Sequence, residues 1–253
     1  RQCLGRVRSV HVGPCPRVSA NTIAMIPARL GSQRLAKKNL RELGGVSLIA
    51  RAIRRCLKAD CFDQIWVNSE SDEIGEIAVR EGAAFHARPV ELAGDTATSE
   101  DYIREFLGLR ECARVVQVHS IAPLLGAARI AEFTRAFEIA GFDTLLGYVP
   151  EAIECAYLDE PVNFSFDRKT NSQHLKPVQR IPWSITGWTR GTYLRAAEAG
   201  SAATYAGRIG WFALDRLEGH VIKTEHDLRI AEALLPLAAG DTGVPSYRPS
   251  GRL

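Results

Sequence analysis

Short apolar runs alternate with longer amphipathic segments along most of this chain, from Asn21 onward. The short runs are rich in branched side chains and have the length of buried strands, whereas the longer segments repeat apolar residues at helical spacing. We expect strands at 22–26, 64–67, 84–86, 114–118, 144–149 and 209–214, and helices at 47–57, 71–81, 99–109, 126–140, 191–199 and 224–239. This alternation predicts an α/β fold with parallel strands and right-handed crossovers.

Two serines and a glycine mark the ends of the first two helices. Ser47 and Ser71 precede the helices, and a serine side chain accepts a hydrogen bond from the unpaired N–H groups of a first turn. Gly82 follows the second helix, where a left-handed residue is common. The apolar spacing predicts a buried face made of Leu48, Ile49, Ala52, Ile53, Cys56 and Leu57 in the first helix, and of Ile130, Phe133, Phe137 and Ile139 in the fourth.

The chain suits one globular domain. Its 253 residues are 46% hydrophobic and 24% charged, enough for one sizeable core. We place the domain at 21–240, between an extraneous tail at 1–20 and an aperiodic tail at 241–253. The pattern breaks at 151–181, where 162–166 alternates in polarity and 167–172 is rich in turn formers. This segment predicts an extended arm with a hairpin.

Composition also bears on the cellular setting. No apolar run approaches the length that a bilayer requires. The six cysteines include no Cys-x-x-Cys pair and no histidine spacing suited to zinc. We therefore expect a cytoplasmic protein with reduced thiols, and we expect neither a membrane nor a nucleic acid as its partner.

The first expected strand runs directly into a basic loop that contains a glycine. Pro27 ends the strand because it has no backbone N–H for the ladder, so the next residues lie at the strand's carboxyl end. In open α/β sheets, ligands bind at this edge. We expect the polar and cationic residues of the loop to ring a crevice that suits phosphate: Arg29, Ser32, Arg34, Lys37 and Lys38.

Positive charge is concentrated around this loop. Residues 1–41 hold seven Arg and two Lys and no acidic residue, whereas the whole chain carries a net charge of only +3. An acid-free stretch beside the first strand raises the local concentration of a polyanion such as a nucleoside triphosphate. The alternative interpretation of this charge pattern is a solvated basic face.

Three blocks of residues carry a family resemblance. The first is Ile26-Pro27-Ala28-Arg29-x-Gly31-Ser32 with Lys38-Asn39-Leu40. The second is 61–67 with Arg88-Pro89-x-Glu91-Leu92-Ala93-Gly94-Asp95. The third, which is less specific, is Thr224-Glu225-x-Asp227-Leu228. In this order the blocks resemble the CMP-sialic acid synthetases, also called acylneuraminate cytidylyltransferases. The resemblance implies a single Rossmann-like nucleotidyltransferase domain with a mostly parallel sheet and an extended dimerisation arm.

The resemblance implies a nucleotidyl transfer between CTP and an acidic α-keto sugar. The hydroxyl on the sugar's anomeric carbon attacks the α-phosphorus, which expels pyrophosphate and leaves a CMP-sugar. Charge grows on phosphate oxygens in the transition state, so positioned cations supply much of the catalysis. The implied contacts with the triphosphate are Arg29, Gly31, Ser32 and Lys38, and those with cytosine are Asn39 and Arg88. The implied wall around the ribose and the base is formed by Asp95, Thr98 and Ser99. The implied contacts with the sugar are His119 and Gln179.

Two positions depart from the family's pattern beside these residues. Gln33 stands where the family has a lysine, and an amide can donate a hydrogen bond but cannot neutralise charge. Because Arg34 is adjacent, we expect the catalytic group to comprise Arg29, Gln33, Arg34 and Lys38. His119 stands where the family has a glutamine, and as a lone histidine it is better interpreted as a neutral polar contact than as a general base.

The largest departure concerns metal binding. The family places two aspartates one residue apart before the closing helix, and they hold magnesium; Val221 and Lys223 occupy those positions here. Valine cannot ligate and lysine repels a divalent ion, so we expect no protein-held metal of that kind and Mg²⁺ only as it accompanies CTP. Glu225 and Asp227 lie nearby, where capping of the closing helix is the favoured interpretation. We hypothesise a catalytic role for Lys223 in place of the ion.

Two further readings of the sequence stay open. Arg29-Leu30-x-Ser32-x-Arg34-Leu35 also resembles the loop of cytidylyltransferases that activate the eight-carbon acid sugar Kdo. From a different class, the lost aspartates suit a catalytically weak paralogue that binds CTP or a CMP-sugar. In the resembled family the arm reaches a second subunit, which implies a homodimer.

Overall fold

The computed structural model describes residues 21–32 and 34–239. The two expected tails, 1–20 and 241–253, lie outside the described residues. Over the described ranges, no helix combines the length and apolar character that crossing a membrane demands.

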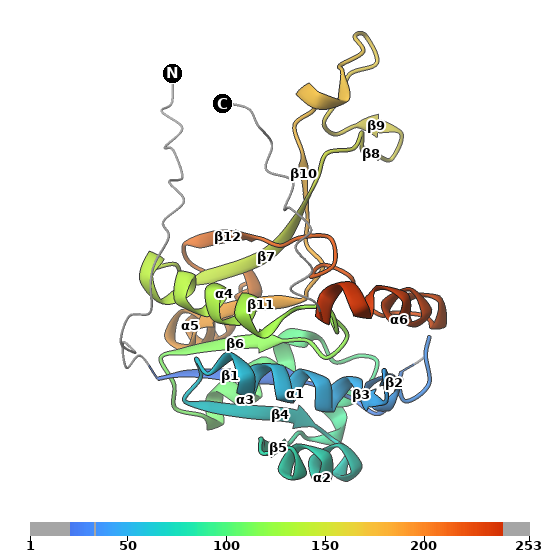
Figure 1. Cartoon of the computed structure of the whole chain (residues 1–253). Helices are drawn as coiled ribbons and strands as arrows, with labels where there is room; N and C mark the ends of the chain where they lie inside the picture. Colours follow the sequence, from blue (N-terminus) through green and yellow to red (C-terminus); the bar gives the residue numbers. More distant parts are fainter. Residues whose placement is uncertain (1–20, 33, 240–253) are drawn as a thin grey trace.

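A single eight-stranded sheet forms the centre of the molecule (Figure 1). Its order is β10-β7-β11-β6-β1-β4-β5, and β12 pairs with β7 as well. The strands are β1 (Thr22–Pro27), β4 (Gln64–Ser69), β5 (Ala84–Ala87), β6 (Arg114–Val118), β7 (Thr144–Glu151), β10 (Val178–Arg180), β11 (Ile185–Thr189) and β12 (Ile209–Ala213). The predicted α/β class with a mostly parallel sheet is confirmed.

Two strands break the predicted parallel rule. β11 runs antiparallel to both of its neighbours, β6 and β7, and β10 runs antiparallel to β7. The reason is topological: β7 leads out into the arm, and the chain returns along β10 and β11 without a crossover helix. The sequence pattern did not predict β11 at all.

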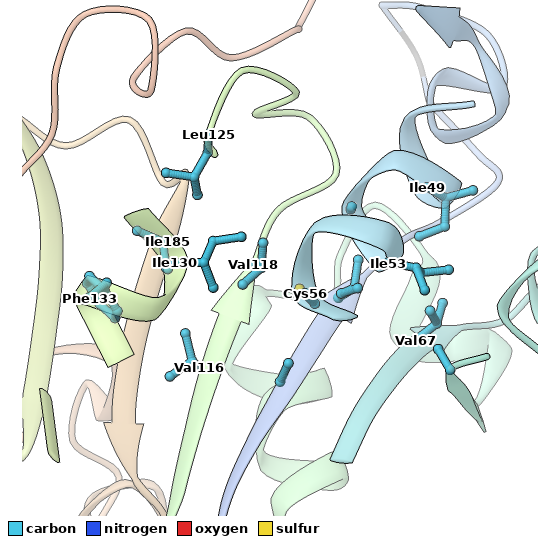
Figure 2. Packing of buried hydrophobic residues seen from close by; sticks show 14 of the residues in the cluster. Ile49, Ile53, Cys56, Val67, Val116, Val118, Leu125, Ile130, Phe133 and Ile185 are labelled. Carbon is cyan, nitrogen blue, oxygen red and sulfur yellow. The ribbon is translucent and has the colours of Figure 1, made fainter. Parts of the chain in front are cut away.

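Helices cover both faces of the sheet. Helices α1 (Leu48–Ala59), α2 (Asp72–Arg80) and α4 (Ala127–Ala140) pack on one face around the larger apolar cluster. Figure 2 shows its centre, where Ile130 of α4 lies beside Val118 of β6 and Ile53 of α1 lies beside Val67 of β4. Helices α3 (Ser99–Leu109) and α5 (Arg190–Glu198) pack on the other face around a second cluster.

A third, smaller cluster joins the basic loop to the last helix of the described chain. Leu35 of the basic loop packs with Leu43 of β2 (Glu42–Leu43) and with Leu228 of α6 (Glu225–Ala239). Strand β2 forms a short hairpin with β3 (Val46–Ser47), which also went unpredicted. This cluster fixes the far end of the basic loop against the C-terminal helix.

The predicted helix ends are confirmed. Ser47 Oγ accepts a hydrogen bond from Ala50 N, and Ser71 Oγ accepts one from Ile74 N. Gly82 follows α2 with a φ of 88°.

The prediction of a buried position is wrong for two residues. Leu57 is 43% exposed and Ile139 is 70% exposed. A helix turns about 100° per residue, so each four-residue step from Ile49 through Ile53 to Leu57 drifts about 40° off the buried line. Ile139 lies nine residues after Ile130, about two and a half turns, and therefore faces away from the sheet.

The predicted arm is present, but its hairpin lies elsewhere. Figure 1 shows residues 151–181 extending away from the body beyond β7 and β10. The hairpin pairs β8 (Ala156–Tyr157) with β9 (Glu160–Pro161), whereas the alternating run 162–166 forms no strand. Asn163 explains the difference, because its side chain donates to the carbonyls of Ile153 and Lys176 at 2.8 Å each and holds this run as a link across the arm.

Candidate active site

One cavity of about 340 Å³ opens at the carboxyl ends of the central strands. It is lined by the loop that follows β1, the start of the loop that follows β6, and the segment between β5 and α3. The structure brings together these sequence-predicted site residues in its lining: Arg29, Gly31, Ser32, Arg34, Lys38, Asn39, Arg88, Asp95 and His119.

The remaining predicted residues lie outside the lining. Thr98 is the N-cap of α3, where its hydroxyl and Asp101 form a reciprocal capping box, and Ser99 is the first helical residue. Gln179 is exposed on β10 of the arm, paired with Pro150. Gln33 lies outside the described residues. Thr98 and Ser99 thus form the start of α3 and do not line the cavity, and Gln179 does not line it either.

Arg29 links two walls of the cavity. Its Nη1 donates to the carbonyl oxygen of Ala93 at 3.2 Å and lies 3.4 Å from Asp95 Oδ1. Arg29 and Asp95 have side chains 40% and 67% exposed, so this ion pair stabilises the fold little. Its consequence is geometric, because it sets the spacing between the basic loop and the 93–95 segment.

Asn39 fixes the basic loop to the loop that follows β6. The side chain is buried, its Nδ2 donates to the carbonyl of Arg29 at 2.8 Å, and its Oδ1 accepts from Ser120 Oγ at 2.6 Å. An amide nitrogen carries two hydrogens, so one N–H remains for the predicted contact with a base. Ser120, which the sequence analysis did not single out, holds this amide in place.

Lys38 lies near several other positively charged side chains. Burial lowers the pKa of Lys38, and the nearby charges of Arg34, Arg29 and Lys223 lower it further. Lys223 does not line the cavity but lies close enough to act on Lys38 electrostatically. The Asp227 carboxylate opposes this effect as the smallest contribution, so the cluster of cations favours the binding of a polyanion, which relieves their mutual repulsion.

His119 lines the cavity from the loop that follows β6. Its Nε2 is buried and has no hydrogen-bond partner among the described residues. Burial, with a smaller contribution from the Lys38 charge, lowers the pKa of His119 to about 4. The ring is therefore neutral near pH 7, which supports its predicted role as a polar contact rather than a general base.

The segment before α6 does not fit a magnesium site. Asp227 accepts hydrogen bonds from the Lys223 and Thr224 backbone N–H groups and from Thr224 Oγ1, at 2.8–2.9 Å. Glu225 pairs with Arg41 at 2.8 Å. No group of three or more His, Cys, Asp or Glu side chains in 21–32 and 34–239 is arranged to hold a metal. The predicted capping role of Asp227 is confirmed.

Two further residues that shape the cavity were missed in the sequence. Tyr102 of α3 lines it, although its spacing with Ile103 and Phe106 reads as part of a buried face. Asn68 of β4 is fully buried and contacts Arg88 beneath the lining. The available signal was position, since Asn68 is the next-to-last residue of a strand that pairs with β1, near the ligand-binding edge.

Comparison with known proteins identifies the family. The sequence model of the family described as cytidylyltransferase matches residues 23–185, more than half of the chain. The chain therefore belongs to the cytidylyltransferase family. All the residues that line the cavity fall inside the matched range.

Individual relatives are similar over part of their length. The chain is 32% identical to N-acylneuraminate cytidylyltransferase A of Danio rerio over 54% of this chain and 32% of the relative. It is 28% identical to N-acylneuraminate cytidylyltransferase B of Danio rerio, over 83% of this chain and 50% of the relative. The chain thus spans half or less of the length of these curated relatives.

A solved structure shows the same fold. A CMP:2-keto-3-deoxy-manno-octonic acid synthetase complexed with CTP superimposes with a TM-score of 0.64 and 16% identity. The match covers 85% of this chain and 98% of that one. At this identity the likeness establishes the architecture of the sheet and its helices.

Proposed function

We propose that this protein activates an acidic α-keto sugar of the sialic acid type with CTP, giving a CMP-sugar and pyrophosphate. The observation that carries the proposal is the cavity at the end of β1, where Arg29, Arg34 and Lys38 converge on a space large enough for a nucleotide. The family membership of the chain supports the same reaction class.

The proposed reaction requires charge stabilisation more than acid–base chemistry. The anomeric hydroxyl oxygen of the sugar bonds to the α-phosphorus, and the bond from that phosphorus to the bridging oxygen of the β-phosphate breaks. Pyrophosphate leaves with the bonding electrons, and the hydroxyl proton passes to solvent. Arg29, Arg34 and Lys38 hold the triphosphate and offset the charge that grows on its oxygens. His119 contacts the sugar as a neutral ring.

CTP should raise the melting temperature of the protein well above the shift given by UTP, ATP or GTP. The physical reason is mass action, because a ligand that binds only the folded state stabilises it. Differential scanning fluorimetry with each nucleotide at equal concentration measures the shifts. Equal shifts for all four nucleotides would reduce the cavity to a general phosphate site and contradict the proposal.

We propose that Lys223 supplies part of the charge that magnesium supplies in the resembled enzymes. The electrostatic effect of Lys223 on Lys38 supports this role. An ammonium brings one charge on a flexible stem, whereas magnesium brings two and fixes several oxygens, so the compensation is partial.

Lys223→Ala should lower turnover with CTP several-fold, and Val221→Asp with Lys223→Asp should sharpen the dependence on magnesium. Pyrophosphate release, measured over a magnesium and EDTA series with a panel of α-keto acid sugars, separates these effects. Turnover that is indifferent to Lys223→Ala would make the lysine a solvated residue. A parent protein that binds CTP but releases no pyrophosphate with any sugar would favour the CTP-binding paralogue.

We propose that the arm pairs two copies of the chain. Its tip exposes Tyr157, Leu158 and Phe166 by 72%, 79% and 72%, an apolar surface that suits burial against a second copy. Deletion of 152–177, with a short linker, should give a monomer that still binds CTP but loses sugar turnover. Multi-angle light scattering decides the point, since a parent protein at the monomer mass of 27.8 kDa contradicts it.

A further inference from the structure

Arg88 is a buried cation without a carboxylate partner. Its side chain is 5% exposed, and it forms no ion pair with another described residue. Burial lowers the pKa of Arg88, although the guanidinium stays charged at neutral pH. An unpaired buried charge costs free energy, so a site that retains one has a use for it. Arg88 lines the cavity, where a ligand is able to supply the missing acceptor.

Asn68 holds two of the three guanidinium nitrogens. Arg88 Nε donates to Asn68 Oδ1 at 2.5 Å, and Arg88 Nη2 donates to the Asn68 carbonyl at 2.6 Å. The guanidinium carbon lies 4.2 Å from the centre of the Tyr102 ring, which covers one face. Nη1 is left without a protein acceptor in the described part of the chain, so both of its N–H groups, with the second N–H of Nη2, are available to a ligand.

Asn68 is itself held rigidly. It is 0% exposed at the end of β4, in register with Pro27 of β1. Its carbonyl also accepts the Ala28 N–H at 3.0 Å, which ties Arg88 to the start of the basic loop. Its Nδ2 lies 3.8 Å from Met25 Sδ. The Nε donor of Arg88 requires an acceptor, and this fixes the amide with Oδ1 toward the arginine.

We propose that Asn68 is the positioning residue for base discrimination, because it fixes Arg88 so that its remaining N–H groups are offered to the base in one orientation. This inference rests on the proposed function. Cytosine presents an acceptor at N3, whereas uracil presents an N–H donor there. Donors held in one orientation toward N3 therefore bind cytosine and oppose uracil, whereas a mobile guanidinium turns to reach a carbonyl on either base. Asn68 acts through Arg88 and does not touch the nucleotide.

The test compares dissociation constants for CTP and UTP, measured by isothermal titration calorimetry without any sugar. In Asn68→Ala, CTP binding should weaken about tenfold, as expected for loss of a charge-assisted hydrogen bond, while UTP binding changes little. The preference for CTP over UTP therefore falls about tenfold. Asn68→Asp keeps an acceptor oxygen and should retain the preference. Asn68→Leu keeps the volume, and replaces the alanine variant if that variant does not fold.

A matched control separates this role from a loss of stability. Thr134→Ala removes another buried polar side chain, whose hydroxyl donates to the Ile130 carbonyl within α4, and it should leave the nucleotide preference unchanged. If Asn68→Ala and Asn68→Leu keep the parent's preference, Asn68 is only a structural residue and the inference is overturned. If the parent itself shows no preference for CTP, the proposed function fails as well, and the parent measurement alone reveals it.

Discussion

Lys38→Ala should lower kcat/KM for CTP roughly 100-fold, which is the loss typical of removing one group that stabilises charge in a transition state. Lys38 lines the cavity among Arg29, Arg34 and Lys223, so its ammonium contributes to a field that acts on the triphosphate. The loss should appear in both kcat and KM, because the ground state already carries several negative charges. Initial rates of pyrophosphate release over a CTP series measure it.

Lys37→Ala is the matched control for this variant. Lys37 is the adjacent residue and carries the same charge, but its ammonium pairs with Glu73 at 3.3 Å and its side chain is 62% exposed. Its replacement should change kcat/KM less than threefold, since exposed charges are screened by solvent and salt. Equal losses in the two variants would show that only the net charge of the loop matters, and the assignment of Lys38 to the triphosphate would then be wrong.

The free energy of unfolding should fall by up to about 3 kcal/mol as the pH drops from 6.5 to 4, because of His119. Its pKa is about 4 in the folded protein and about 6.5 in an unfolded chain. Between these values the unfolded chain binds the proton and the folded protein does not, so acid favours unfolding. Each pKa unit corresponds to about 1.4 kcal/mol, and the full loss is reached below pH 4.

Urea unfolding of the parent and of His119→Gln at pH 7.0, 5.5 and 4.5 tests this expectation. Glutamine keeps a neutral polar side chain and has no proton to gain, so the variant should lose about 2–3 kcal/mol less than the parent between the first and last pH. His174→Gln, which replaces an exposed histidine of the arm, controls for the loss of a histidine as such. Parent and His119→Gln curves that run parallel would remove His119 as the cause.

Most strands of the sheet could be predicted because the signals for them lie within short stretches of the sequence. The strand at Arg114–Val118 and the helix at Ser99–Leu109 have the predicted bounds, since apolar period and capping residues lie within each element. β11 could not be predicted in this way. Its run Ile185–Thr189 contains a glycine and two threonines, and its pairing depends on β6 and β7, which lie far away in the sequence.

The same difference between local signals and long-range contacts decides which residues of the candidate site could be predicted. The residues of the basic loop were predicted because the end of β1 sets their location whatever surrounds them. Asn68 was not, because its contact with Arg88 exists only once β4 and β5 lie side by side. The low pKa of His119 likewise depends on burial and on Lys38, which no spacing in the sequence reveals.

The position of β11 between β6 and β7 has a consequence for the growing chain. Four strands of the central sheet, β1, β4, β5 and β6, can pair as soon as residue 118 has been made. The free side of β6 then presents unpaired N–H and C=O groups between the apolar side chains Val115, Val116 and Val118. That side closes only when Ile185–Thr189 is synthesised, after the whole arm. An open, apolar strand edge is a template for association between chains. Nascent chains of this protein therefore pass through a stage in which they need protection from one another.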